Sequence, residues 1–317
     1  MSNKTQTMSK SINRKGSLIN RILYHKGFYI MFLPVFIFAI IFHYLPMLGV
    51  QYAFYSYKGV QAPVFVGLAN FQKMFNMPGF WSAFGNTIWL SVVKLLLNTF
   101  MAVAISLLLN ELRIMKFKKA AQTIVYLPHF LSWVVTASVF TLILSPTSAG
   151  LVNSILMKLG IVNEGIYFLG NKDLWQPVFF LINIWKDTGW GTIIFMATLS
   201  SINPELYEAA ALDGAGRWKQ MRYITLPALN NTIIIVLILN LAKVMNLFES
   251  AFVLQNDAVI QKADVLQTYI YTQTFNSGAL PDYGYTTAVG LVSSLVGMVL
   301  VILCDRASYK ARGRGIV

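Results

Sequence analysis

Long apolar segments separated by short basic ones dominate this sequence. The chain has 317 residues, of which 56% are hydrophobic and only 12% are charged, whereas soluble domains carry about 25% charged residues. A helix needs about 20 apolar residues to cross the hydrocarbon core of a bilayer. The segments that meet this length are residues 28–50, 86–110, 120–144, 175–199, 228–253 and 283–304. The sequence therefore predicts an all-α integral membrane protein with six transmembrane helices.

The basic residues are distributed unevenly between the apolar segments. Seventeen of the 25 Lys and Arg residues lie in residues 1–27, 111–119, 203–227 and 305–317, and five lie in the alternate connecting segments. Because cytoplasmic loops are enriched in Lys and Arg, both termini are expected to face the cytoplasm. The net charge of +13 is thus explained by orientation. Its dispersal over four segments argues against nucleic-acid binding.

The polar segment 203–227, between the fourth and fifth apolar segments, has the pattern of two short helices. Asn203 suits an N-cap and Pro204 the first helical position. The Asp-Gly-Ala-Gly sequence at 213–216 is expected to end the first helix, because glycine tolerates the backbone angles that stop a helix. A second short helix is expected over residues 217–226, before a proline opens the next apolar segment.

The same segment carries Glu208-Ala209-Ala210, then Gly214, then Ile224, then Leu226-Pro227. This pattern, with every spacing kept, resembles the EAA signature of the integral membrane permeases of bacterial ATP-binding-cassette (ABC) importers. The resemblance implies the type I ABC importer permease fold, with residues 203–227 as a cytoplasmic coupling helix that docks in a groove of the ATPase subunit. The residues expected to make this contact are Glu208, Ala209, Ala210, Asp213, Gly214, Gly216 and Arg217.

Two other segments resemble permeases for sugars. Residues 67–71 read Gly-Leu-Ala-Asn-Phe after the first span, as in sugar-importer permeases. Residues 32–46, from Phe-Leu-Pro to Tyr-Leu-Pro, and the Tyr-Ala-Phe at 52–54 resemble permeases for polysaccharide uptake in Gram-positive bacteria. The resemblance covers nearly the whole chain and is nearest to the maltose-type, oligosaccharide-uptake branch. It implies import of a sugar, expected to be an oligosaccharide.

The resemblance also implies domains, partners and location. Residues 1–27 and 309–317 are expected to be cytoplasmic tails and residues 28–308 the six-span permease domain, in the bacterial cell membrane. The expected partners are a second homologous permease, two ABC ATPase subunits and an extracellular solute-binding lipoprotein. The sequence has no Gly-x-x-x-x-Gly-Lys-Ser/Thr motif. The chain is therefore expected to be no enzyme and to bind no cofactor or metal, with ATP and Mg²⁺ bound by the partner ATPase.

Polar and aromatic residues in the fourth and fifth apolar segments are the candidates for the substrate pathway. Ionisable residues inside a membrane are costly and usually face a cavity or a partner helix. Amides and indole rings also suit a sugar, which needs hydrogen bonds and apolar stacking. In the fifth segment these residues recur every three positions, so one broad helical face is expected to carry them. The candidates are Trp185, Lys186, Asp187, Trp190, Asn240, Lys243, Asn246 and Glu249.

Other interpretations of these residues remain open. Intramembrane ion pairs, or pairs with a second permease chain, explain Lys186, Asp187, Lys243 and Glu249 equally well. Lys94 and Asn98, on one face of the second span, are expected to make structural pairs. An importer permease for amino acids or phosphate is one alternative function, and an ion-driven transporter that uses the same acids and Lys186 as relay groups is another. A membrane-bound enzyme lacks a nucleophile or metal-ligand pattern.

Overall fold

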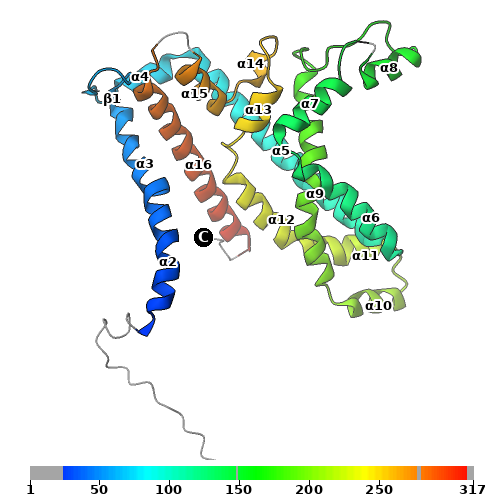
Figure 1. Ribbon diagram of the computed structural model, residues 1–317. Coiled ribbons are helices and arrows are strands. Elements are labelled where there is room, and N and C mark those ends of the chain that lie inside the picture. Colours follow the sequence, from blue (N-terminus) through cyan, green and yellow to red (C-terminus); the bar gives the residue numbers. More distant parts are fainter. Residues whose placement is uncertain (1–23, 148, 277–279, 313–317) are drawn as a thin grey trace, which may run out of the picture. The chain divides into compact units, whose positions relative to one another are not determined.

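The computed structural model describes residues 24–147, 149–276 and 280–312. The chain divides into two compact units, residues 1–51 and 52–317. The described ranges are predominantly helical, and the sheet within them is one antiparallel pair, β1 (Tyr55–Ser56) and β2 (Val64–Phe65) (Figure 1). Most of the two predicted tails, residues 1–23 and 313–317, lies outside the described residues.

The described part of the first unit is one apolar helix that continues to Phe54. Its parts are α2 (Lys26–Ala39), the π-helical turn η1 (Ile40–Tyr44), α3 (Leu45–Met47) and the 3-10 turn η2 (Leu48–Phe54). It has 29 residues, and the mean hydropathy of its most apolar 18-residue window is 2.2, so it can cross a membrane, as predicted. The π-turn lies just before Pro46, whose ring would clash with a carbonyl four residues earlier in an ordinary helix. The wider turn accommodates the proline.

Long helices frame the second unit. They are α5 (Pro78–Glu111), α9 (Trp175–Ser200), α12 (Leu226–Leu241) and α16 (Tyr283–Arg312). The helices α5 and α9 pack against each other, and Leu90, Phe179, Ile182 and Phe195 are buried among their side chains. The start of α5 lies eight residues before the predicted start at 86, because Pro78 occupies the first turn, where its missing N–H is not needed.

By length and composition, four helices of the described ranges can cross a membrane, or five if one bent pair is a single span. They are Lys26–Phe54, Pro78–Glu111, Arg217–Leu241 and Tyr283–Lys310. The 26-residue α9 is long enough but is not among them. It carries Lys186 and Asp187 near its middle. Charged residues at such positions usually face a polar partner or a cavity rather than lipid.

The predicted third span, residues 120–144, is not one continuous helix. The helix α6 (Met115–Tyr126) passes into the 3-10 turn η3 (Leu127–Phe130), and α7 (Trp133–Ile143) then leaves at a bend of 104°. Pro128 lies in η3 and cannot donate a helical hydrogen bond. Ser132 caps α7, because its hydroxyl accepts from the backbone N of Val135 at 3.2 Å. The prediction of one continuous helix, which rested on apolar composition, was therefore wrong, because Pro128 and the Ser132 cap end one helix and start another.

Lys186 of α9 binds the carbonyl groups that this break leaves free. Its Nζ donates to the O of His129 at 3.1 Å and to the O of Leu131 at 2.7 Å, and its side chain is buried. Every backbone polar group within a membrane needs a partner. Gly189, further along α9, permits the close approach, since a Cβ added there would lie 2.0 Å from the O of Val125 in α6.

The predicted fifth span, residues 228–253, starts earlier and ends earlier. The helix α11 (Arg217–Gln220) continues through the π-turn η4 (Met221–Thr225) into α12, as one helix of 25 residues. The prediction of a separate helix over 217–226 was therefore wrong. As at Pro46, a π-turn just before Pro227 lets the helix run through a proline.

After Leu241 the chain turns through residues 242–247 before α13 (Phe248–Leu254) begins. Side chains from two other helices hold this turn. The hydroxyl of Ser91 in α5 donates to the O of Val244. The side chain of Gln267 in α15 (Leu266–Phe275) accepts from the N of Phe248 at 2.8 Å. The described residues thus contain a second interruption of a predicted span, again with its backbone groups bound by side chains.

Short helices gather at one end of the second unit and the segment 203–227 lies at the other (Figure 1). The first end carries α4 (Ala69–Asn76), α8 (Leu151–Lys158), α13, α14 (Ile260–Ala263) and α15. The second end carries α10 (Pro204–Leu212) and α11.

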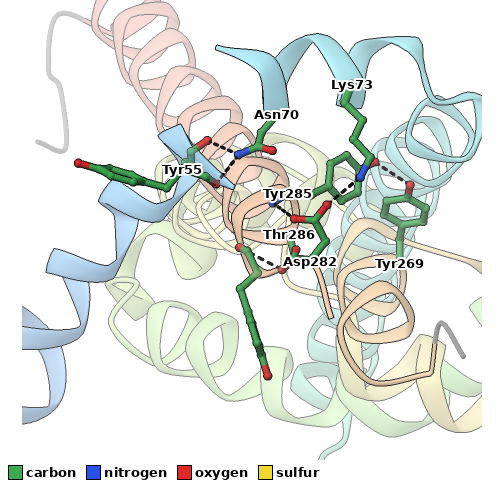
Figure 2. Close-up of polar contacts among 9 residues, drawn as sticks. Tyr55, Asn70, Lys73, Tyr269, Asp282, Tyr285 and Thr286 are labelled. Carbon is green, nitrogen blue, oxygen red and sulfur yellow. Dashed lines mark hydrogen bonds and ion pairs between the residues drawn. The ribbon is translucent and has the colours of Figure 1, made fainter. Parts of the chain in front are cut away.

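Figure 2 shows how the start of α16 is fastened to β1 and α4. The side-chain Nδ2 of Asn70 donates to the O of Ala53 and to the O of Tyr55, each at 2.9 Å. Lys73, one turn further along α4, forms an ion pair with Asp282 at 2.7 Å. Asn70, the asparagine of the Gly-Leu-Ala-Asn-Phe sequence, therefore has a structural role, since it binds two carbonyl groups at the end of the first span.

Two further contacts complete this junction. The hydroxyls of Tyr269 in α15 and Tyr285 in α16 are hydrogen-bonded at 2.8 Å (Figure 2). Gly284 allows α16 to approach β1, because a Cβ added there would lie 2.1 Å from the O of Tyr55.

We predict that Asn70→Ala lowers the free energy of unfolding by about 1–3 kcal/mol, because it leaves buried carbonyl groups without donors. Denaturant unfolding of the purified chain in detergent measures this. Asn76→Ala is the control, since Asn76 is exposed at the end of the same helix. Equal stability of the two variants would contradict the structural role.

We predict that Lys186→Met also destabilises the chain by about 1–3 kcal/mol, because two carbonyl groups at the break of the third span lose their donor. Lys262→Met is the matched control. Lys262 is also paired, with Asp173 at 3.0 Å, but that pair is exposed, and exposed pairs contribute little. If both lysine variants unfold at the same denaturant concentration, Lys186 does not hold the break.

Candidate functional site

Both interruptions border a single cavity of about 500 Å³ in the second unit. Residues from α5, η3, α9, α12 and the turn at 242–247 line it. Irregular backbone at membrane depth is tolerated where it lines a cavity, and discontinuous helices often form the binding sites of transporters. The cavity is therefore the candidate site.

One face of α5 supplies a polar wall of the cavity. Ser91, Lys94, Asn98 and Ala102 line it and follow each other at the three- to four-residue spacing that places side chains on one face of a helix. The Oδ1 of Asn98 is buried and has no hydrogen-bond partner among the described residues. This wall offers both hydrogen-bond donors and a free acceptor.

A charged cluster lies where α5, η3 and α9 meet. The Oδ2 of Asp187 lies 3.7 Å from the Nζ of Lys94, and its Oδ1 lies 3.5 Å from the Nδ1 of His129. The His129 ring stacks on the indole of Trp190, with ring centres 4.8 Å apart and planes 13° apart. Trp190 is 51% exposed and lines the cavity. The result is a charged pair beside a flat aromatic surface.

The structure brings five of the eight candidate pathway residues to this cavity. They are Asp187, Trp190, Asn240, Lys243 and Asn246. The other three lie outside its lining. Trp185 packs edge-on against Phe140 of α7 at 5.2 Å, Lys186 binds the carbonyl groups of the break, and Glu249 lies on α13.

The prediction that one helical face of the fifth span carries these polar residues was wrong, because the helix ends at Leu241. Asn240 is its last polar residue, Lys243 and Asn246 lie in the turn, and Glu249 lies in the first turn of α13. Three of the four still line the cavity because the turn itself borders it.

Sequence reasoning missed much of the cavity. It gave no role to Ser91 or His129, and it expected only structural pairs from Lys94 and Asn98. Lys94 does make such a pair, with Asp187. Both residues of the pair nevertheless line the cavity. The proline at 128 next to His129 was the available signal, since a proline inside an apolar segment favours a break.

The segment 203–227 has the local structure that its sequence predicts at its start and its middle. The Oδ1 of Asn203 accepts from the N of Glu205 at 3.1 Å, and Pro204 is the first residue of α10. Gly214 has a φ of +75°, a left-handed conformation that favours glycine. The predicted cap and the predicted end of the first helix are both confirmed.

Side-chain contacts hold α10 against α11 and η4. The hydroxyls of Tyr207 in α10 and Thr225 in η4 lie 3.0 Å apart, and the Nε2 of Gln220 in α11 donates to the O of Tyr207 at 3.5 Å. Meanwhile Leu212 is 90% exposed and Trp218 is 71% exposed.

The candidate coupling residues lie on this surface. In α10, Glu208 and Ala209 are exposed and Ala210 is half-buried, while Asp213, Gly214 and Gly216 connect the two helices. Arg217 reaches Glu111 at the end of α5, at 3.4 Å. The segment therefore presents an open surface with apolar and charged groups, attached to α5 and continuous with α12.

Comparisons with known proteins give the family. The family described as binding-protein-dependent transport system inner membrane component matches residues 102–312. The polygalacturonan/rhamnogalacturonan transport system permease protein YteP of Bacillus subtilis (strain 168) is 38% identical over 311 residues, which are 97% of this chain and 95% of that protein. Protein LplB of the same organism is 39% identical, over 92% of this chain and 91% of its own.

A solved structure is also similar along nearly the full length. A chain of a bacterial ABC transporter involved in the import of the acidic polysaccharide alginate has a TM-score of 0.84 and 35% identity, over 93% of this chain and 99% of that chain. The chain studied here therefore belongs to the family of binding-protein-dependent transport system inner membrane components and is the membrane permease component of an ABC importer.

Proposed function

We propose that the chain carries an oligosaccharide across the bacterial cell membrane, through the cavity between the two interrupted helices. The observation that supports this most is that both interruptions and the stacked His129–Trp190 pair border the same space. A sugar ring has apolar C–H faces for the indole and hydroxyls for amides and charged groups. The relatives named for polygalacturonan and alginate transport support a saccharide as the substrate.

We also propose six spans with both termini in the cytoplasm. The helix α9, with 26 residues, is the span that raises the number from five to six. Its two charged residues are bound by other elements rather than exposed to lipid. Lys186 binds two carbonyl groups, and Asp187 lies between Lys94 and His129. Such pairing lowers the cost of charge within a membrane. The residues 28–308 then form the permease domain, and the basic ends lie on the inner side.

The segment 203–227 is the proposed contact with the ATPase. It holds the matched spacing from Glu208 to Pro227, exposes Leu212 and Trp218, and lies at the opposite end of the unit from α8, α13 and α14 (Figure 1). The helix that starts at Arg217 runs without a break to Leu241, directly before the turn at the cavity. A displacement of α10 is thus transmitted through one rigid helix to the cavity wall.

The complete importer in this proposal has a second homologous permease, two ABC ATPases that bind ATP and Mg²⁺, and an external solute-binding lipoprotein. A structure of the alginate transporter in complex with an alginate pentasaccharide-bound periplasmic protein supports the last partner; its permease chain has a TM-score of 0.85 with this chain. The short helices α13 and α14, at the other end of the unit, are the proposed contact for the binding protein.

We predict that Gly214→Pro leaves the chain in the membrane but abolishes uptake of labelled oligosaccharide by cells that contain the complete importer. Proline cannot adopt the φ of +75° at Gly214, so α10 changes its angle to α11 and coupling is lost. Uptake and membrane content of the chain are measured together.

Gly160→Pro is the matched control. Gly160 also has a positive φ, of +69°, and its N also donates to a backbone carbonyl three residues earlier, but it follows α8 at the other end. Normal uptake by the Gly214 variant, or equal loss in both variants at equal membrane content, would refute the coupling role.

A further inference from the structure

One lysine side chain in the lining of the cavity, that of Lys243, has no acidic partner among the described residues. Four ionisable residues line it, namely Lys94, His129, Asp187 and Lys243. Asp187 is shared between Lys94 and His129. No acidic side chain of the described residues forms an ion pair with Lys243. The lining therefore sets two lysines and a histidine against a single aspartate.

The position of Lys243 is set by the turn after α12. The N of Lys243 donates to the O of Asn240 at 3.0 Å, and its O accepts from the N of Asn246 at 2.9 Å. Ser91 binds the next residue, Val244, through its carbonyl group. The backbone that carries Lys243 is therefore fixed at the cavity, and its exposed side chain is available to a ligand.

The surrounding groups define what that ligand is. Asn240 and Asn246 on either side of Lys243 line the cavity with amides, and the Oδ1 of Asn98 is a buried acceptor without a donor among the described residues. Trp190 offers an exposed ring. A ligand that satisfies all of them has a flat apolar face, hydroxyl donors and an anionic acceptor. A hexuronic acid unit has these three properties together.

We propose that Lys243 recognises a carboxylate of the transported sugar, so that the cavity selects uronate-containing oligosaccharides over neutral ones. This rests on the proposed function of the same cavity. A charge-assisted hydrogen bond to a carboxylate is about twice as strong as a neutral one, and a positive cavity with low-dielectric walls also concentrates anions. Lys94 does not take this role, because Asp187 already faces it.

The test compares the uptake of charged and neutral trisaccharides in proteoliposomes that contain the complete importer and its binding protein. The probes are trigalacturonate, its fully methyl-esterified form, trimannuronate and neutral maltotriose. The quantity measured is the ratio of charged to neutral uptake. Because each variant works with the same binding protein, the selectivity of that protein cancels when variant and wild-type ratios are compared.

We expect wild-type chain to favour a charged trimer, and Lys243→Gln to lower the ratio about tenfold, the loss of one charged hydrogen bond. Lys243→Arg should keep most of the ratio, since the cation is retained. Lys262→Gln is the control for loss of a lysine outside the cavity, and it should leave the ratio unchanged.

Other outcomes overturn the proposal in separable ways. If wild-type importer takes up only neutral sugars, or if Lys243→Gln lowers charged and neutral uptake equally, Lys243 does not select carboxylates, while sugar import stands. If none of the four sugars is taken up in the presence of ATP, both the selectivity and the proposed function are contradicted.

Discussion

The structure depends on how backbone polar groups are satisfied where a helix is interrupted inside an apolar segment. In water such a break costs little, but in a bilayer each free N–H or C=O needs a partner from the protein. The described chain meets this need with side chains from neighbouring helices. Lys186 binds two carbonyl groups at the break of the third predicted span, and Ser91 and Gln267 bind the turn that ends the fifth. Because the partners come from other helices, each break is possible only when α5, α9 and α15 are packed in place.

The two breaks explain why the cavity lies where it does. Interruption turns His129 and Lys243 out of regular helices and brings them to the same space as Asp187 and Trp190 of α9. The opposite end of the same unit carries the segment 203–227 (Figure 1), joined to the cavity by the unbroken helix Arg217–Leu241. A permease needs both a place for its solute and a mechanical link to its energy source. In the proposed mechanism one helix of this chain connects them, with a π-turn at Met221–Thr225 where it leaves the segment 203–227.

Much of this arrangement could be predicted from the sequence, because the signals were local. Apolar segment length gave the long helices, and Asn203, Pro204 and Gly214 gave the start and end of α10. The two interruptions were missed because they depend on distant partners. Pro128 alone permits a kink or a break, and only Ser132 and Lys186 together decide for a break. Nothing local near residue 242 predicts that Ser91, about 150 residues earlier in the chain, stabilises a turn there. The different positions of Trp185 and Trp190 also depend on a distant partner, since Trp185 packs on Phe140 and lies outside the cavity.

The central claim is that the cavity between the two breaks is the sugar pathway, and the two tryptophans of α9 test it most directly. Trp190 lines the cavity and Trp185 does not, although 51% and 41% of their surfaces are exposed. The measurement is ATP-dependent oligosaccharide uptake by the complete importer with Trp190→Ala or Trp185→Ala at equal membrane content. We predict a loss of about tenfold for Trp190→Ala, since burying roughly 55 Å² of apolar surface between a sugar ring and the indole contributes about 1.4 kcal/mol, and near-normal uptake for Trp185→Ala. Equal uptake by the two variants, or a larger loss for Trp185→Ala, would contradict it.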